Sequence, residues 1–411
     1  MGLERVADES VWRSLRIIFI GSALLFLVNI YFGFSNALTD GAIARGQILI
    51  HLHAGSIGWI TLSAIGFAIW VVTGSRAVSA SYARRVRVLA IAAVLVFAAY
   101  IPNFWLAFGG SSVTALLPIF GSLSVLTIWT AAILVAAQLR RQPTLTNVHL
   151  LAAGALLVAA IGATVGALLG LERVIGLFLP LPQGERVGAH AGMMDTYLFL
   201  IAAAIVEAIV RPAGQRWSWP GVAQAACWTV GASIVPVAFF LGAVEQLLPV
   251  FGLLLLLGLA MFLVRVAWRA IILGPMADGK KPWAFFGTLW LVVFMGLFLM
   301  AVASGDFASL PAWFGAAFVH AGFVGMMTNL ILAVHSARAA ASANVVAWGE
   351  AAGMWTLNLG LVAFIGLKIA ADVRIGALVM GVGVLISVGT MVARLWSSGT
   401  TSVEHGAMAP S

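Results

Sequence analysis

Residues 246–264 read QLLPVFGLLLLLGLAMFLV, a stretch without a charged side chain that lies between Glu245 and Arg265. A helix needs about 20 predominantly apolar residues to cross the hydrocarbon core of a bilayer. The stretch therefore predicts a transmembrane helix at 246–268, and similar apolar runs occur on both sides of it.

The composition of the whole chain is that of a membrane protein with many helices. Of its 411 residues, 62% are hydrophobic and 9% are charged, whereas soluble domains are about half apolar and about a quarter charged. This composition excludes an ordinary soluble enzyme. The apolar runs predict an all-α, polytopic bundle of twelve transmembrane helices, at 13–36, 48–73, 87–108, 112–138, 146–170, 187–210, 219–242, 246–268, 283–304, 311–337, 343–368 and 375–396.

The twelve helices are expected to form one transmembrane domain over residues 1–397, because no soluble domain interrupts them. Residues 398–411 are expected to be a disordered tail. The single cysteine, Cys227, excludes an internal disulfide and a cysteine-based metal cluster. The formal net charge of +8 is not clustered with aromatic residues on one face, so we expect membrane lipid and no nucleic acid as a partner.

The basic residues predict the orientation, because cytoplasmic loops carry an excess of Lys and Arg. With the N-terminus in the cytoplasm, the outer side holds five of the 22 basic residues and the inner side the other 17. This asymmetry requires an even number of helices. It predicts that both termini are cytoplasmic, in the inner membrane of a prokaryote. The five outer residues are Arg45, Arg173, Arg186, Lys368 and Arg374.

Three of the seven histidines open a His-Ala-Gly tripeptide, at His53, His190 and His320. The copies are 137 and 130 residues apart, which corresponds to four helices each time. They open helices 2, 6 and 10 near the outer surface. This pattern predicts a pseudo-threefold repeat of a four-helix unit, over approximately 13–138, 146–268 and 283–396. A chance match is the alternative, since Ala and Gly are common here.

A histidine inside a membrane is costly unless it has a partner, and it marks a functional site by default. Three together favour a metal or haem site, because neutral imidazole is the commonest metal ligand. Capping or interhelical hydrogen bonding is the alternative. His51 lies two residues before His53, so on a helix the two point about 200° apart and only one faces a given site.

Other polar side chains also fall inside the predicted helices. Met193 and Met194 follow His190, and a thioether beside imidazole suits Cu(I), although methionine is common in packed helices. Tyr197 lies on the same helix face as His190, and a chain from His190 through Tyr197 towards Glu207 could carry protons. Alternatively, Glu207 forms an ion pair with Arg211.

This arrangement of twelve helices with histidines on helices 2, 6 and 10 resembles subunit I of the haem–copper oxidase superfamily. The segment from Arg45 through His51 and His53 to Trp59 is most similar to helix 2 of nitric oxide reductase large subunits. The copies at His190 and His320 also resemble NnrS-like haem–copper membrane proteins.

The resemblance implies a low-spin haem b between helices 2 and 10, with His53 (or His51) and His320 as axial ligands. It places His190 where the family has its first copper ligand. It also implies that the haem propionates meet Lys368 and Arg374, for which ordinary interfacial snorkelling is the alternative.

Two departures from the family pattern limit the implied chemistry. Members of the family that reduce oxygen or nitric oxide carry paired histidines on helix 7. No histidine occurs in the predicted helix 219–242. Helix 10 has only His320, since His335 lies about 22 Å further along the helix. We therefore expect no complete binuclear centre of the oxidase type.

Two functional classes remain. The first is a membrane protein that binds haem, with copper as a second candidate cofactor, and handles electrons or a diatomic gas such as NO or O2. Its candidate partners are an electron donor, a cytochrome subunit or a second copy of the chain. If it is an enzyme, it is an oxidoreductase of the nitric oxide reductase or haem–copper oxidase type. The alternative is a transporter or channel with a histidine-lined polar path.

Overall fold

A computed structural model of the chain describes residues 9–39, 41–74, 78–108, 116–175, 183–211, 216–276, 281–304, 309–336, 344–369 and 373–397. Within these ranges twelve helices are long and apolar enough to cross a membrane, and no strand occurs. The prediction of an all-α polytopic bundle with twelve spans is confirmed.

Nine spans are single helices or a helix with a short continuation, and three change their helical type midway. The first to fourth spans are α1 (Glu9–Leu38), α2–η1–α3 (Arg45–His53, Ala54–Thr61, Leu62–Thr73), α4–α5 (Ala80–Tyr100, Asn103–Phe108) and α6 (Leu116–Leu139). The fifth to eighth are α7 (Asn147–Ile175), α8 (Gln183–Val210), α9 (Trp219–Phe240) and α10–η2–α11 (Val244–Phe262, Leu263–Ala267, Trp268–Leu273). The last four are α12 (Lys281–Ser304), α13–η4–α14 (Ala312–His320, Ala321–Thr328, Asn329–Ser336), α15 (Asn344–Ile369) and α16 (Arg374–Ser397).

The third span differs most from its predicted range of 87–108. It begins at Ala80, where the Oγ of Ser79 accepts a hydrogen bond from the backbone N–H of Tyr82 at 3.3 Å and caps the helix. It is interrupted before Asn103, since Pro102 lacks the N–H that a continuous helix needs at that position.

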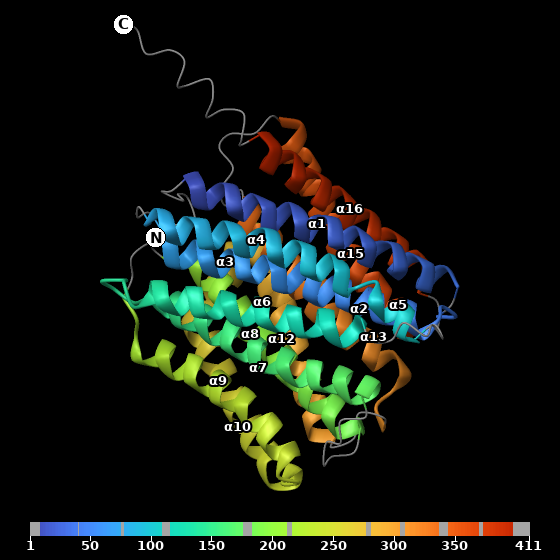
Figure 1. Cartoon of the computed structure of the whole chain (residues 1–411). Helices are drawn as coiled ribbons and strands as arrows, with labels where there is room; N and C mark the ends of the chain where they lie inside the picture. The colour runs from blue at the N-terminus through green and yellow to red at the C-terminus, as the bar shows by residue number, and fades with distance from the viewer. Residues whose placement is uncertain are drawn as a thin grey trace, which may run out of the picture.

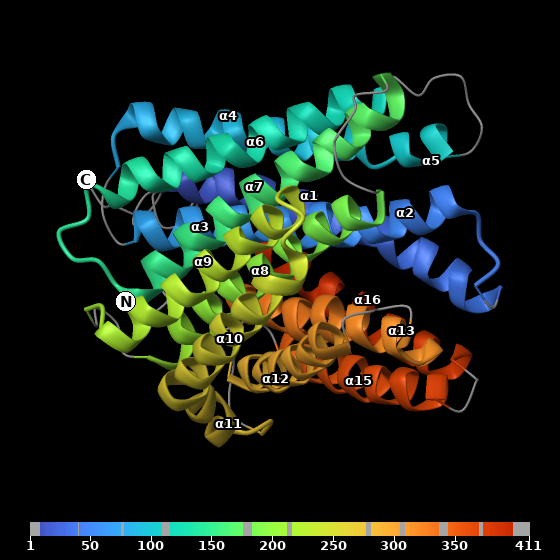
Figure 2. The ribbon, with the colours of Figure 1, turned by 90° about the horizontal axis from the view of Figure 1, so that it is seen from below.

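The helices run roughly along one direction, and α1 begins at the same end of the bundle where α16 ends (Figure 1). Figure 2 shows the first four spans (blue to cyan) on one side and the last four (orange to red) on the other, with α9 and α10 on a third flank. The even number of spans accounts for the shared end. Which membrane face this end meets stays a prediction.

The three spans that carry the tripeptide form the centre of the bundle. Of the most apolar window of each span, 83% is buried in the second, 72% in the sixth and 78% in the tenth, against 28 to 50% in the other nine. Direct contacts join η1 to η4, and α8 to η4 and α14. Histidines on these spans therefore face protein from several sides.

Repeats 1 and 3 pack alike at their central glycines. A Cβ added to Gly55 would meet Asn29 of α1, and one added to Gly58 would meet Leu25, four residues earlier. In the third repeat, Gly322 and Gly325 meet Phe294 and Trp290 of α12 in the same order. The first span of each of these two segments thus contacts the central span in the same register.

Candidate functional site

Four histidines lie in the first turns of the central spans, and each has one ring nitrogen bound to a backbone carbonyl. The Nδ1 of His51, His53, His190 and His320 lies 2.8 Å from such an oxygen. A carbonyl can only accept, so Nδ1 carries the proton, and in a neutral imidazole Nε2 then keeps its lone pair. This is the form in which histidine binds a metal ion.

Within the described residues the hydrogen bonds of these four rings are made by Nδ1, so Nε2 keeps its lone pair for a ligand. All four side chains are half-buried, and within the described residues none of their Nε2 atoms is both buried and without a partner. His335, further along the tenth span, differs in this respect. Its Nε2 is buried without a hydrogen bond, and its ring meets Phe19 edge-on at 4.4 Å between centroids.

The carbonyl partners divide the four histidines into two kinds. His53 donates to Leu49 and His320 to Ala316, each four residues earlier on the same helix. His51 instead donates to Asn29 of α1, and His190 donates to Gly162 of α7. The second kind is therefore held by the neighbouring span rather than by its own.

Glycines give the second kind a further common feature. A Cβ on Gly33, four residues after Asn29, would lie 2.9 Å from Cε1 of His51. A Cβ on Gly166, four residues after Gly162, would lie 2.6 Å from Cε1 of His190. Both rings fill the space that a side chain on the preceding span would need.

These environments relate His190 to His51 and not to His53, so the second tripeptide is displaced by two residues from the other two. In the third repeat the position that corresponds to His51 holds Phe318, whose ring packs on Phe294 at 4.8 Å between centroids. Equal placement of all three tripeptide histidines was the expectation from the sequence. In the structure the three rings are placed differently, because the position of each ring depends on its hydrogen-bonding partner rather than on the tripeptide.

The histidines lie near one another in two combinations, which we call the two pairs. His53 lies within electrostatic range of His190, and His320 lies within electrostatic range of His51. Each pair contains one histidine of each kind. The two-residue spacing of His51 and His53 turns them to different sides of α2, as the sequence predicts, so this helix contributes to both pairs.

Aromatic rings flank His53, one member of the pair of His53 and His190. The imidazole of His53 stacks on Phe104 of α5, with centroids 3.9 Å apart and planes 24° apart. Phe104 stacks in turn on Phe108, over which the guanidinium of Arg45 lies at 5.5 Å. This column joins the histidine to one of the five basic residues of the predicted outer side.

Around the pair of His51 and His320, the expected propionate residues lie close to the surface. The ring of Phe364 on α15 contacts His320 at 4.5 Å between centroids, and Lys368 follows one turn later on the same helix. Lys368 is half-buried, and Arg374 is exposed in the first turn of α16. Both therefore lie at the end of the bundle that holds the histidines.

Beneath His53 and His320 the helices widen into π-helical segments, which sequence reasoning missed. η1 begins directly after His53 and η4 directly after His320. Thr61 donates to the carbonyl of Ser56 at 2.9 Å, and Thr328 to that of Phe323 at 3.0 Å, both five residues back. The shared Gly at +5 and Thr at +8 from each histidine was the available sequence signal. Short π-helical turns occur frequently at functional sites.

Hydrogen bonds between the three central spans lie below the histidines. Trp59 donates its indole N–H to Thr328 at 3.1 Å, and Tyr197 donates to Thr61 at 3.4 Å. All four side chains are at most 1% exposed. The tyrosine thus joins the sixth span to the second instead of leading towards Glu207.

Glu207 forms the expected ion pair, but with two arginines. Its Oε1 lies 2.7 Å from Arg265 and 3.6 Å from Arg211. Asn147 donates to the same oxygen at 3.0 Å, and Gln224 accepts from Arg265 at 2.5 Å. This buried cluster ties α7, α8, α9 and η2 together at the end opposite the histidines.

A second polar cluster lies in the last repeat. Glu350 and Asn358 of α15 make two separate contacts. Glu350 forms an ion pair with Arg394 at 2.5 Å, and the amides of Asn358 and Asn329 bind each other reciprocally at 2.9 and 3.0 Å. Trp290 also donates to Asn358 at 2.9 Å. These contacts fasten the helices of the last repeat to one another.

Within the described ranges, no group of three or more His, Cys, Asp or Glu side chains has the arrangement of a metal site. Axial ligation by two histidines, which the resemblance implies, involves fewer side chains than such a group. The chain matches no protein-family model, and no curated protein matches its sequence. The resemblance to the haem–copper oxidase superfamily therefore stays a prediction that rests on the histidines and the twelve-span topology.

Proposed function

We propose that the protein binds a haem between α2 and α13, with His51 and His320 as axial ligands, and uses it to transfer electrons or to handle a diatomic gas. The observation that carries the proposal is that His51 and His320 lie close enough for their charges to interact. The two imidazoles come from different central spans, and each has Nδ1 bound and Nε2 open. The sequence left His51 and His53 as alternatives, and this pairing favours His51.

The side chains around the pair suit a haem. Gly33 leaves room for the His51 ring, and the carbonyl bonds of both rings hold their planes in place. Lys368 and Arg374 lie at the surface end, where cations bind carboxylates such as propionates. When bound by two imidazoles, a haem supplies a one-electron redox couple whose potential the surrounding residues set.

The pair of His53 and His190 supports copper as a second cofactor. The Sδ of Met194 lies 3.0 Å from the position of a Cβ on Gly162, whose carbonyl binds His190. A thioether next to imidazole nitrogens suits Cu(I). We propose that these two histidines, with the Met194 side chain close by, hold a copper ion.

An absorption spectrum of the purified protein tests the haem proposal. We expect a Soret band with sharp bands after reduction. Both His51→Ala and His320→Ala should remove the low-spin signal, because each deletes one axial ligand. His53→Ala is the matched control, since it lies two residues away on the same helix and should leave the haem in place. A colourless protein, or a haem lost with His53 but kept without His51, contradicts the proposal.

A histidine-lined transport path is the second class that the sequence allows. It receives less support, since Thr61, Tyr197 and Thr328 below the histidines are buried and bonded to one another. An open path for a polar solute would have to separate these contacts. A colourless preparation together with solute uptake into vesicles would favour this class.

A further inference from the structure

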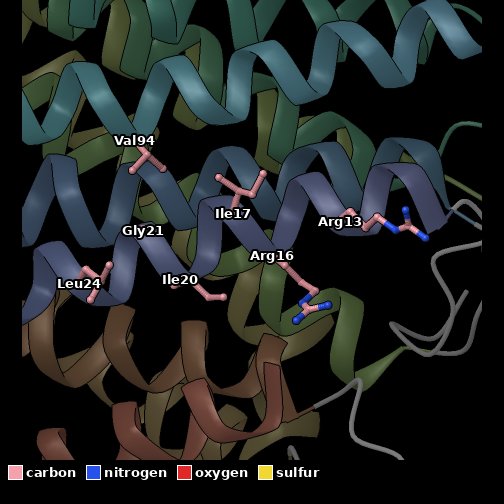
Figure 3. A pocket seen from close by; sticks show the side chains of 7 residues that line it. All are labelled: Arg13, Arg16, Ile17, Ile20, Gly21, Leu24 and Val94. Atoms are coloured by element: carbon pink, nitrogen blue, oxygen red, sulfur yellow. The ribbon is translucent and has the colours of Figure 1, made fainter. Parts of the chain in front are cut away.

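A lipid-facing groove runs between α1 and α4, away from the histidines. Gly21 lies beside Val94, where a Cβ on the glycine would collide with the valine side chain. The groove has a volume of about 400 Å³, and Figure 3 shows its lining side chains along α1 with Val94 across from them. They are Arg13, Arg16, Ile17, Ile20, Gly21, Leu24 and Val94.

The groove is charged at one end and apolar along the rest. Figure 3 shows Arg13 and Arg16 towards the beginning of α1, with Ile17, Ile20 and Leu24 following along the helix. Arg16 and Leu24 are eight residues apart, or about 12 Å along the helix axis. Leu24 is 60% exposed. An occupant must therefore carry a negative charge at the membrane edge and an apolar chain that lies deeper.

Arg16 is the residue in this groove that most needs a partner. Its side chain is half-buried, and its Nε is buried without a hydrogen bond among the described residues. Arg13 is more exposed and lies 3.6 Å from Glu9. The two NH2 groups of the half-buried Arg16 guanidinium are not among the buried atoms without a partner, and they can bind an anionic oxygen from outside the chain.

A third basic residue, Arg87 of α4, lies at a depth in the membrane similar to that of Arg13 and Arg16. Both helices start at the same membrane face, and Gly21 adjoins Val94. Arg87 is exposed and lies seven residues before Val94, so it shares the groove-facing side of α4, about 10 Å nearer the surface. This depth falls between those of Arg16 and Arg13.

We infer that this groove binds one anionic phospholipid, with its phosphate at Arg16, between Arg13 and Arg87, and an acyl chain along Ile17, Ile20 and Leu24. Charge complementarity and the depth of the arginines select this occupant. The membrane face that gathers most basic residues attracts anionic lipid, and basic residues near a membrane surface bind its headgroups. A zwitterionic lipid offers the same chains without the net charge.

The test uses the full-length protein, freed of lipid in detergent and titrated with phosphatidylglycerol or with phosphatidylcholine of the same chains, with binding counted by native mass spectrometry. We expect phosphatidylglycerol to bind about tenfold more tightly, and Arg16→Gln to remove about tenfold of that affinity. Arg140→Gln is the matched control, because Arg140 is exposed at the end of α6 and lies outside the groove. Equal binding of the two lipids, or equal losses in both variants, overturns the inference.

Two further arms separate a lipid from a free phosphate. Leu24→Trp should fill the groove and weaken phosphatidylglycerol binding, whereas Leu126→Trp, on α6 and 62% exposed, should not. Inorganic phosphate should compete only weakly, since it has no chain to occupy the apolar part. If phosphate displaces the lipid fully at equal concentration, or both tryptophan variants behave alike, the acyl part of the groove is not used and the inference fails.

Discussion

Gly166 and Gly170 are one turn apart on α7, and the space beside them differs completely. A Cβ on Gly166 would lie 2.6 Å from the His190 ring, whereas one on Gly170 would meet nothing within 4 Å. We expect Gly166→Ala to destabilise the protein by about 1–3 kcal/mol, as overpacking does. Gly170→Ala should be neutral or stabilising by up to about 1 kcal/mol, because alanine favours the helix. Thermal unfolding in detergent measures both, and equal midpoints would contradict the placement of His190.

Glu207 and Arg265 are buried at 2% and 7% exposure, and they are joined by a contact of 2.7 Å. Removing one member leaves a buried charge without its partner, which costs about 3–5 kcal/mol. We expect Glu207→Gln or Arg265→Met to lower stability by this order. The double variant should recover a clear part of the loss, because neither charge then remains. Denaturant unfolding of the four proteins gives the interaction energy, and strictly additive losses would contradict a direct pair.

The sequence predicts which histidines form the site, but it does not predict which neighbouring groups each ring binds. The tripeptide at His190 matches those at His53 and His320 letter for letter, yet its ring binds the preceding span as His51 does. The signal for this displacement lay in another helix, in the glycines at 33 and 166. A short motif describes only residues that are adjacent in the sequence, whereas the position of a side chain also depends on the helices packed around it.

At the scale of elements, the two π-helical segments depend on Thr61 and Thr328. Thr328 donates to Phe323 and accepts from Trp59, and Thr61 makes the corresponding bonds to Ser56 and Tyr197. We expect Thr328→Val or Thr61→Val to cost about 1–3 kcal/mol, because each leaves a buried donor of another span unsatisfied. Amide hydrogen exchange in the segments should rise. Thr130→Val, whose hydroxyl is exposed and bonds only within α6, is the control and should change neither measurement.

The number and order of the spans followed from hydropathy, but their ends and interruptions did not. The predicted third helix began at 87, since arginines precede it, while the observed helix begins at Ala80. Apolar runs report only the part of a helix inside the hydrocarbon, and helices continue into the headgroup region. The π-helical segments have no distinct periodicity, because a few wide turns scarcely alter an apolar pattern.

For the whole molecule, the distribution of basic residues predicts both termini in the cytoplasm. Of the 22 Lys and Arg residues, 17 fall on one face when the twelve spans alternate. Reporter fusions after Arg141 and after Ser397 should therefore both report a cytoplasmic position. A fusion after Gly41 should report the outside. Reversed signals would invert the orientation and would place the four histidines near the cytoplasmic face.

We predict that the protein reduces oxygen and nitric oxide only slowly. The seventh span, α9, has no histidine, so it supplies no ligand of the kind that completes a binuclear centre in the resembled family. We expect the purified protein, given an artificial electron donor, to reduce O2 or NO at rates close to the background. Sustained turnover that His190→Ala abolishes would show that another ligand set completes the centre.

His51 and His53 belong to one short helix, α2, yet His51 lies near His320 and His53 lies near His190. A ligand that draws His51 towards α13 must rotate or shift the same segment that carries His53. Occupancy at one pair should then change affinity at the other, and thermodynamic reciprocity requires the two effects to be equal in size. We therefore expect the two pairs to be coupled through α2.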